Sequence, residues 1–216
     1  MAIRQGKYTL ILPSRPSIYG SGSVVGKTES EGPLNNEFDF AFKSDDMGEE
    51  TFEKAESAMQ KKAIEYAISK ACLTAKDINL IMAGDLLNQC IGTSFGIREL
   101  GIPFIGMYGA CSTMALSMAL ASLLVDVKTA NYAVCSTSSH FASAERQFRL
   151  PLEYGGQVPP SAQRTVTGAG ASVIGANQKG KPNVEAVIFG KIVDLGIKDA
   201  NNMGAAMAPL NGILRP

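Results

Sequence analysis

The amino-acid sequence predicts an α/β fold in which a mixed β-sheet is layered with helices. Short apolar segments typical of buried strands occur along the chain together with segments whose apolar residues recur at helical spacing. Turn-forming clusters and many of the 22 glycines separate these segments. Apolar residues make up 45% of the 216 positions and charged residues 19%, so the chain is able to bury a sizeable core.

Charge and cysteine content exclude several classes of function. Twenty basic residues balance twenty acidic ones, so the net charge gives no support for a nucleic-acid partner. The four cysteines lack a Cys-x-x-Cys pair and the chain has one histidine, so we expect reduced thiols and no metal site. The sequence shows neither the apolar core of a signal peptide nor a charge-free run of about 18 apolar residues. We therefore expect a cytoplasmic protein whose membrane association is at most peripheral.

The first fifty residues contain one short predicted strand and one motif that has to be rejected. Residues 8–12 form the strand, and residues 33–50 read as an acidic loop. The stretch from Gly20 to Thr28 resembles a phosphate-binding loop. That motif needs four residues between its first glycine and Gly-Lys-Thr, whereas Gly22 leaves three and Gly20 leaves five. The spacing argues against a nucleotide site.

Next in order come a helix, a strand and a second helix. Apolar residues at helical spacing predict a helix that begins near Thr51, and residues 79–83 read as a buried strand. Asp85 follows this strand, at the position where α/β sheets place ligand sites. An acid there also commonly caps the following helix, which is predicted over residues 92–100. Both interpretations of Asp85 stay open.

A cysteine stands at the start of the most apolar predicted helix. A strand over residues 103–107 leads through Gly109 and Ala110 to Cys111 and Ser112, and residues 112–125 predict a helix that is buried on most sides. Backbone N–H groups at a helix N-terminus favour negative charge, so they favour a thiolate and a pocket for anions. Alternatively, Cys111 is a small apolar residue that packs at the helix start.

Polar residues follow the next predicted strand, residues 131–137. They include Ser138, Ser139 and His140, and then Arg146 and Arg149. If this strand is a parallel neighbour of the strand before Cys111, the two strand ends bring His140 and Cys111 to one edge of the sheet. The two arginines lie three residues apart, on one face of a helix, and paired guanidinium groups suit recognition of a carboxylate. The alternative is a solvated surface network with Glu145.

The C-terminal part is predicted to contain a long loop and two strands. Residues 151–160 are rich in turn formers and suit a lid or a subunit contact. Residues 165–175 and 184–193 predict two strands that pair with each other in antiparallel fashion. A new segment starts near residue 202.

Two short motifs stand out: Gly109-Ala110-Cys111-Ser112 before the apolar helix and Thr167-Gly168-Ala169-Gly170-Ala171 at a later strand. In this order they resemble the thiolase superfamily. This resemblance implies a thiolase-like mixed sheet, with an N-terminal half in residues 1–195 and the start of a second half in residues 196–216.

A more specific similarity depends on seven further segments. They are Glu31–Leu34, Ala83–Gln89, Tyr108–Thr113, Thr137–His140, Ala144–Arg149, Glu153–Gln157 and Asp194–Ile197. Their combination resembles a non-enzymatic branch of that superfamily, the stage V sporulation protein AD family of spore-forming bacteria.

The resemblance implies a protein that binds dipicolinic acid (pyridine-2,6-dicarboxylate) and helps to move it, with calcium, into the developing spore. It also implies that the protein acts in a channel complex with other stage V sporulation A-operon proteins. In that complex the protein would be peripheral to the forespore or spore inner membrane. No further cofactor is expected. A rigid diacid needs fixed donors for two carboxylates. The expected ligand-binding residues are Asp85, Cys111, Ser112, Ser138, Ser139, His140, Arg146 and Arg149.

Two other functions are compatible with the resemblance. In the ketoacyl synthases of the superfamily, a cysteine at the position of Cys111 is the acyl-accepting nucleophile, and it works with a His and a second His or Asn from the second half. This chain has only His140, after a different strand, so we expect no enzymatic activity. The third hypothesis is a structural subunit of a channel complex with a vestigial pocket.

The resemblance also implies contacts with further protein. Thiolase-like proteins are usually homodimers through an edge strand, for which residues 131–137 are the candidate. The apolar helix over residues 112–125 normally packs against its counterpart in a second half that continues after Pro209. We therefore expect an uncovered apolar face and self-association through it.

Overall fold

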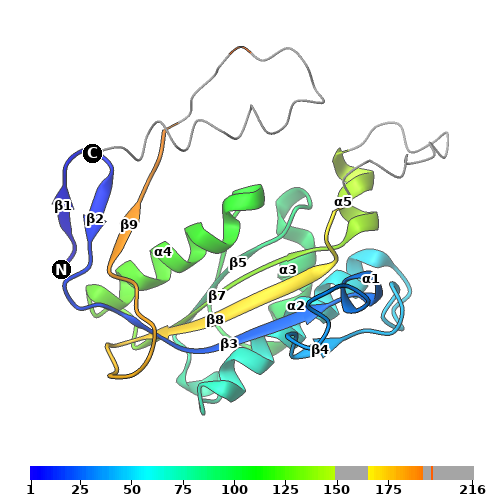
Figure 1. Cartoon of the computed structure of the whole chain (residues 1–216), viewed down its shortest axis with the longest axis horizontal. Helices are drawn as coiled ribbons and strands as arrows, with labels where there is room; N and C mark the ends of the chain where they lie inside the picture. Colours follow the sequence, from blue (N-terminus) through cyan, green and yellow to red (C-terminus); the bar gives the residue numbers. More distant parts are fainter. Residues whose placement is uncertain (149–164, 192–195, 197–216) are drawn as a thin grey trace.

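The computed structural model of the chain describes residues 1–148, 165–191 and 196, with the backbone alone for residues 145–148. Its centre is a six-stranded sheet in the order β4-β3-β8-β7-β5-β6 (Figure 1). The strands are β3 Ser17–Val25, β4 Phe40–Ala41, β5 Leu80–Gly84, β6 Phe104–Gly106, β7 Tyr132–Ser139 and β8 Gly168–Gly175. The helices are α1 Lys27–Ser30, α2 Phe52–Lys70, α3 Ile91–Ile97, α4 Thr113–Asp126 and α5 Phe141–Phe148.

The sheet is mixed, as the sequence predicts. β5 runs parallel to both β6 and β7, and β3 runs parallel to β4. β8 is antiparallel to both of its neighbours, β3 and β7. A separate small sheet in the order β1-β2-β9 consists of Ile3–Gln5, Thr9–Ile11 and Ala186–Ile188.

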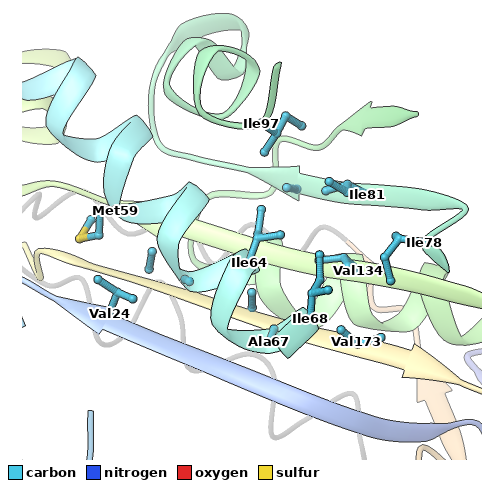
Figure 2. Packing of buried hydrophobic residues seen from close by; sticks show 14 residues of the cluster. Val24, Met59, Ile64, Ala67, Ile68, Ile78, Ile81, Ile97, Val134 and Val173 are labelled. Atoms are coloured by element: carbon cyan, nitrogen blue, oxygen red, sulfur yellow. The ribbon is translucent and has the colours of Figure 1, made fainter. Parts of the chain in front are cut away.

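Alternate residues of the central strands point to opposite faces of the sheet, and each face has its own core. On one face Val134 and Val173 pack with α2 and with Ile97 of α3 (Figure 2). On the other face Cys135 and Ile174 pack with α4. The result is a three-layer arrangement with the sheet in the middle (Figure 1).

Helix α2 begins where the sequence predicts it. Its N-cap is Thr51, whose side-chain oxygen accepts the N–H of Lys54. The helix lies very close to β3, because a Cβ added to Gly22 would be 2.1 Å from the carbonyl oxygen of Ala63. Gly20 and Gly22 of the rejected phosphate-binding motif therefore belong to strand β3, which the sequence did not predict.

Two predicted pairings are wrong. Residues 165–175 and 184–193 do not form one antiparallel pair, because β8 lies between β3 and β7 whereas β9 pairs with β2. Residues 131–137 are not an edge strand either, since β7 is hydrogen-bonded to β5 on one side and to β8 on the other. The sheet edge beyond β5 is β6.

Helix α4 is less buried than the sequence predicts. Its sheet-facing residues are buried, but its methionine and leucine side chains are only half-buried and Ala115 is exposed. The small sheet covers part of the helix, through contacts of Leu10 and Val187 with Ala119 and Leu123. The predicted self-association through the rest of this face stays a prediction.

Two other sequence-based expectations concern the chain as a whole. The proposed boundary between residues 195 and 196 lies outside the described residues except for Gly196 itself. Among the helices of the described part, none has the length and apolar character needed to cross a bilayer.

Candidate functional site

The polar segments singled out in the sequence follow three parallel strands at one edge of the sheet. Ala83 of β5 is paired with Gly106 of β6, and Gly84 is paired with Thr137 of β7, so the three strands end together. Cys111 comes after β6 and His140 comes after β7. The prediction that both lie at the same sheet edge is confirmed. They are not on neighbouring strands, however, because β5 separates β6 and β7 by roughly 10 Å.

Asp85 is buried directly after β5 and serves the loop and helix that follow. Its Oδ1 accepts the N–H of Leu87 at 2.7 Å. Its Oδ2 accepts the N–H of Thr93, the third residue of α3, at 2.7 Å and the Thr93 hydroxyl at 2.6 Å. The structure thus shows the helix-capping role that the sequence left open. With 1% of its surface exposed, Asp85 is not presented to a ligand in this conformation.

His140 is fully buried, and both of its ring nitrogens have partners. Nδ1 accepts the N–H of Ala142 at 3.2 Å, so Nε2 carries the proton and donates to the carbonyl oxygen of Asp45 at 2.7 Å. The ring stacks with Phe52 and Phe141 at centroid distances of 5.0 and 5.2 Å. Burial lowers the pKa of His140, which favours the neutral imidazole. In this state the ring anchors the segment after β7.

The serines on either side of His140 also have specific partners. Ser139 donates to the carbonyl oxygen of Val166 at 2.6 Å. Ser138 donates to Oε1 of Glu56 at 2.9 Å, and Ser143 in the first turn of α5 lies 2.8 Å from Oε2 of the same carboxyl group. Glu56 on α2 therefore connects the last strand of the site with the helix that follows it.

Glu56 is a buried carboxyl group without a cation beside it among the described residues. Its side chain has no solvent exposure. Burial is the main cause that raises its pKa to about 7, and the charges of Asp85 and Glu53 add to the rise. The hydroxyls of Ser143 and Ser138 oppose the shift. A carboxyl group with this pKa changes its charge near neutral pH.

Cys111 and Ser112 are exposed at the same sheet edge. Both belong to a 3₁₀ turn, Ala110–Ser112, that precedes the first residue of α4. The Ser112 hydroxyl donates to the carbonyl oxygen of Gly109 at 2.7 Å and makes no cap bond to the helix. Cys111 is a free thiol. Among the predicted site residues whose side chains the structure describes, these two are the ones exposed to solvent.

Of the two predicted site arginines, the structure describes only the backbone of Arg146. Arg146 lies in α5, one helical turn after Ser143, and its side chain is outside the described atoms. Arg149 lies outside the described residues. The structure therefore brings the backbone of Arg146 to the edge of the sheet where β5, β6 and β7 end, through α5.

The site has two layers with different chemistry. The inner layer contains Asp85, Glu56 and neutral His140, which cannot supply positive charge to an anion. The outer layer contains the exposed Cys111 and Ser112, and α5 carries Arg146. A groove of about 480 Å³ lies elsewhere, between α2 and α3, and none of the predicted site residues lines it. Within the described ranges, no three His, Cys, Asp or Glu side chains gather as they would around a metal ion.

Three residues that hold the inner layer together are not among the predicted site residues: Glu56, Thr93 and Ser143. A signal for Glu56 was present, because it falls in the helical stripe of Phe52, Ala55 and Met59 that faces the sheet. A charged residue inside an apolar stripe needs a buried partner.

Comparison with solved structures supports the fold. The 3-oxoacyl-[acyl-carrier-protein] synthase III of Aquifex aeolicus VF5 superposes with a TM-score of 0.52 at 17% identity, over 76% of this chain and 54% of that one. A variant of OleA from Xanthomonas campestris, crystallised with cerulenin, gives a TM-score of 0.51 at 16% identity, over 75% and 57%. At such identities the likeness concerns the fold alone. The fold is the thiolase-like α/β fold that the sequence motifs imply.

Comparison with protein sequences identifies the family. Stage V sporulation protein AD of Bacillus subtilis (strain 168) is 44% identical over 204 residues, which cover 94% of this chain and 60% of that protein. The chain thus spans about three fifths of the length of this relative. The family model of stage V sporulation protein AD (SpoVAD) matches residues 6–212, a longer range than the motifs noticed in the sequence. The chain belongs to the stage V sporulation protein AD family.

Proposed function

We propose that this chain acts in stage V of sporulation as a binding protein for dipicolinic acid, which it helps to move into the developing spore. Membership of the stage V sporulation protein AD family supports the sporulation role. The observation that carries the choice of ligand class is the position of α5. This helix starts at the shared end of β5, β6 and β7 and carries Arg146, and Arg149 follows it.

The charges of the described residues indicate which groups would bind the ligand. Dipicolinate carries two carboxylates on a rigid ring, and the buried carboxyl groups of Asp85 and Glu56 offer them no positive charge. In this proposal Arg146 and Arg149 supply positive charge, because their guanidinium groups suit bidentate pairing with carboxylates. The exposed turn that contains Cys111 follows β6 at the same edge of the sheet.

The surroundings of Cys111 favour a binding protein over an acyl-transferring enzyme. A nucleophilic cysteine needs a base within hydrogen-bond reach. Among the described residues no hydrogen bond involves the Cys111 thiol, and both nitrogens of His140 are occupied by Ala142 and Asp45. Incubation with an acyl-coenzyme A tests this alternative. A mass increase of one acyl group on Cys111 would favour the enzyme.

The deciding experiment is a thermal shift of the 216-residue chain with dipicolinate, with and without calcium. A ligand that binds the folded state raises the melting temperature, by an amount that grows with its concentration over Kd. Isomeric pyridine dicarboxylates serve as ligand controls, because their carboxylates point in other directions. The same experiment without a shift would favour the purely structural subunit.

Variants then test the two arginines. We expect R146A and R149A each to reduce the shift and the double variant to abolish it. Arg4 lies on β1 of the small sheet, so R4A removes one positive charge at a distance from the site and serves as the matched control. A shift that survives the double variant would show that other groups bind the carboxylates.

The proposed partners follow from the same family role. We propose contacts with other stage V sporulation A-operon proteins and a peripheral position at the forespore or spore inner membrane. We also propose a homodimer through β6 rather than β7. β6 is the terminal strand of the sheet beside β5, and Ile105 on it is 46% exposed.

A further inference from the structure

One buried side chain spans the segment around His140. Glu56 lies in the second turn of α2, and its two carboxyl oxygens reach Ser138 at the end of β7 and Ser143 at the start of α5. Phe52, one turn earlier on α2, stacks with the His140 ring. The segment from Ser138 to Ser143 is therefore attached to α2 at three successive points.

The hydrogen-bond geometry fits a protonated Glu56. The Ser143 hydroxyl lies 2.8 Å from Oε2 of Glu56 and 3.1 Å from the carbonyl oxygen of His140. A hydroxyl has one proton, so it donates to one of these two acceptors. With a proton on Oε2, Glu56 donates to Ser143 and Ser143 donates to the His140 carbonyl. Each group then has a partner and Glu56 itself carries no charge.

Ionisation of Glu56 disturbs this arrangement. The carboxylate and the His140 carbonyl then compete for the single proton of Ser143. The titratable neighbours that face Glu56 are Asp85, from the loop after β5, and Glu53, from its own helix, and both are acidic. β7 and the described side chains of α5 contribute hydroxyls only, and α3 contributes Gly92, which lies against both carboxyl groups. No cation among these groups compensates the charge.

We propose that Glu56 is a positioning residue of the ligand site, whose protonated carboxyl group fixes α5 against β7 and thereby sets the place of Arg146. Arg146 follows Ser143 by one turn of α5, so a change at Ser143 is transmitted along the helix. Loss of the Glu56 proton weakens dicarboxylate binding. This inference rests on the proposed function, because Arg146 is the group through which Glu56 acts on the ligand.

The test measures dipicolinate affinity of the 216-residue chain by calorimetry between pH 5.5 and 8.5. The proteins are the wild type, E56Q and E65Q. Glu65 is exposed on the same helix, so E65Q makes the same chemical change outside the interior. The titration of the ligand itself is common to all three. With a pKa of about 7, the wild-type affinity is expected to fall about tenfold between pH 6 and pH 8.

The variants separate positioning from a purely structural role. We expect the affinity of E65Q to depend on pH as that of the wild type does. We expect the affinity of E56Q at pH 8 to stay within about twofold of its affinity at pH 6. A structural role alone would lower the affinity of E56Q equally at each pH. If E56Q does not fold, S143A cuts the link to α5 and is expected to bind at pH 6 as weakly as the wild type at pH 8. An E56Q profile parallel to the wild type, or an unaffected S143A, overturns the inference.

A wild type that binds no dipicolinate at any pH refutes the proposed function, and the role of Glu56 is then decided without ligand. Hydrogen exchange of the peptide 138–148, corrected for the intrinsic pH dependence of exchange, reports how firmly α5 is held. We expect exchange to increase between pH 6 and pH 8 in the wild type and E65Q, but not in E56Q. Equal behaviour of all three overturns the positioning role as well.

Discussion

Replacing Gly22 with alanine tests how α2 is seated on the sheet. An added Cβ would lie 2.1 Å from the carbonyl oxygen of Ala63 and 2.9 Å from the amide nitrogen of Ala67. Both are backbone atoms of α2, so no side-chain rotation can make room. Because real Cβ contacts do not fall below 3.0 Å, the helix has to move away from β3 by roughly 1 Å.

The cost of this movement follows from the packing of α2. Overpacking a core costs about 1–3 kcal/mol, and a backbone contact belongs at the upper end of this range. A gap of about 1 Å also removes up to roughly half of the dispersion energy of the contacts it opens between α2 and β3, whose residues Ala67 and Val24 belong to one core cluster (Figure 2). Alanine in place of glycine stabilises the folded state by only about 0.4–1 kcal/mol, because it lowers the conformational entropy of the unfolded chain. We expect a net loss of about 2–3 kcal/mol.

Urea unfolding followed by circular dichroism measures this loss, as a lower midpoint at an unchanged slope. Gly170 provides the matched control, since it lies in β8 of the same sheet and an added Cβ meets nothing within 4 Å. We expect G170A to change the free energy of unfolding by less than about 1 kcal/mol, in the stabilising direction. A G22A variant as stable as G170A would refute the close seating of α2 on β3.

Three further predictions concern the site and the sheet edge. Glu56 has a folded-state pKa of about 7 against an ordinary 4.5, so the folded protein loses about 3 kcal/mol of stability as the pH rises from 4.5 through 7. In urea titrations at several pH values, E56Q should lack this loss, and a wild type of constant stability would contradict the pKa. D85A leaves three donors of Leu87 and Thr93 without their acceptor and should cost about 2–4 kcal/mol, whereas a loss under 1 kcal/mol would show that water replaces the carboxylate. Light scattering should find a dimer for the wild type and for I3R on the small sheet but a monomer for I105R, and a monomeric wild type would refute pairing through β6.

Several elements of the central core were predictable because each of them has a local signal. The apolar stripe of α2 and its cap at Thr51, the buried strand before Asp85 and the apolar helix after Cys111 all depend on residues close together in the sequence. Local periodicity and capping chemistry act within one or two turns, so a single sequence contains them. The family motifs are also local, and they led to the thiolase-like fold.

Strand order and the partners of buried polar groups depended on the tertiary structure. β8 and β9 are close in sequence, yet one pairs with β3 and β7 and the other with β2, 175 or more residues away. The strand signal of Ser17–Val25 is weakened by its glycines, whose requirement arises only because α2 lies on them.

The same division applies to the site. The chain order shows that Asp85, Cys111 and His140 each follow a predicted strand. Because parallel strands end at the same edge of a sheet, the sequence also predicts that these residues share an edge. Which side chains point inward could not be derived, since burial depends on the neighbouring elements. The sequence by itself determined the fold family and the edge of the sheet at which the candidate site residues gather. The tertiary structure decided that His140 is a buried anchor and that Glu56, 84 residues earlier, is tied to it through two serines.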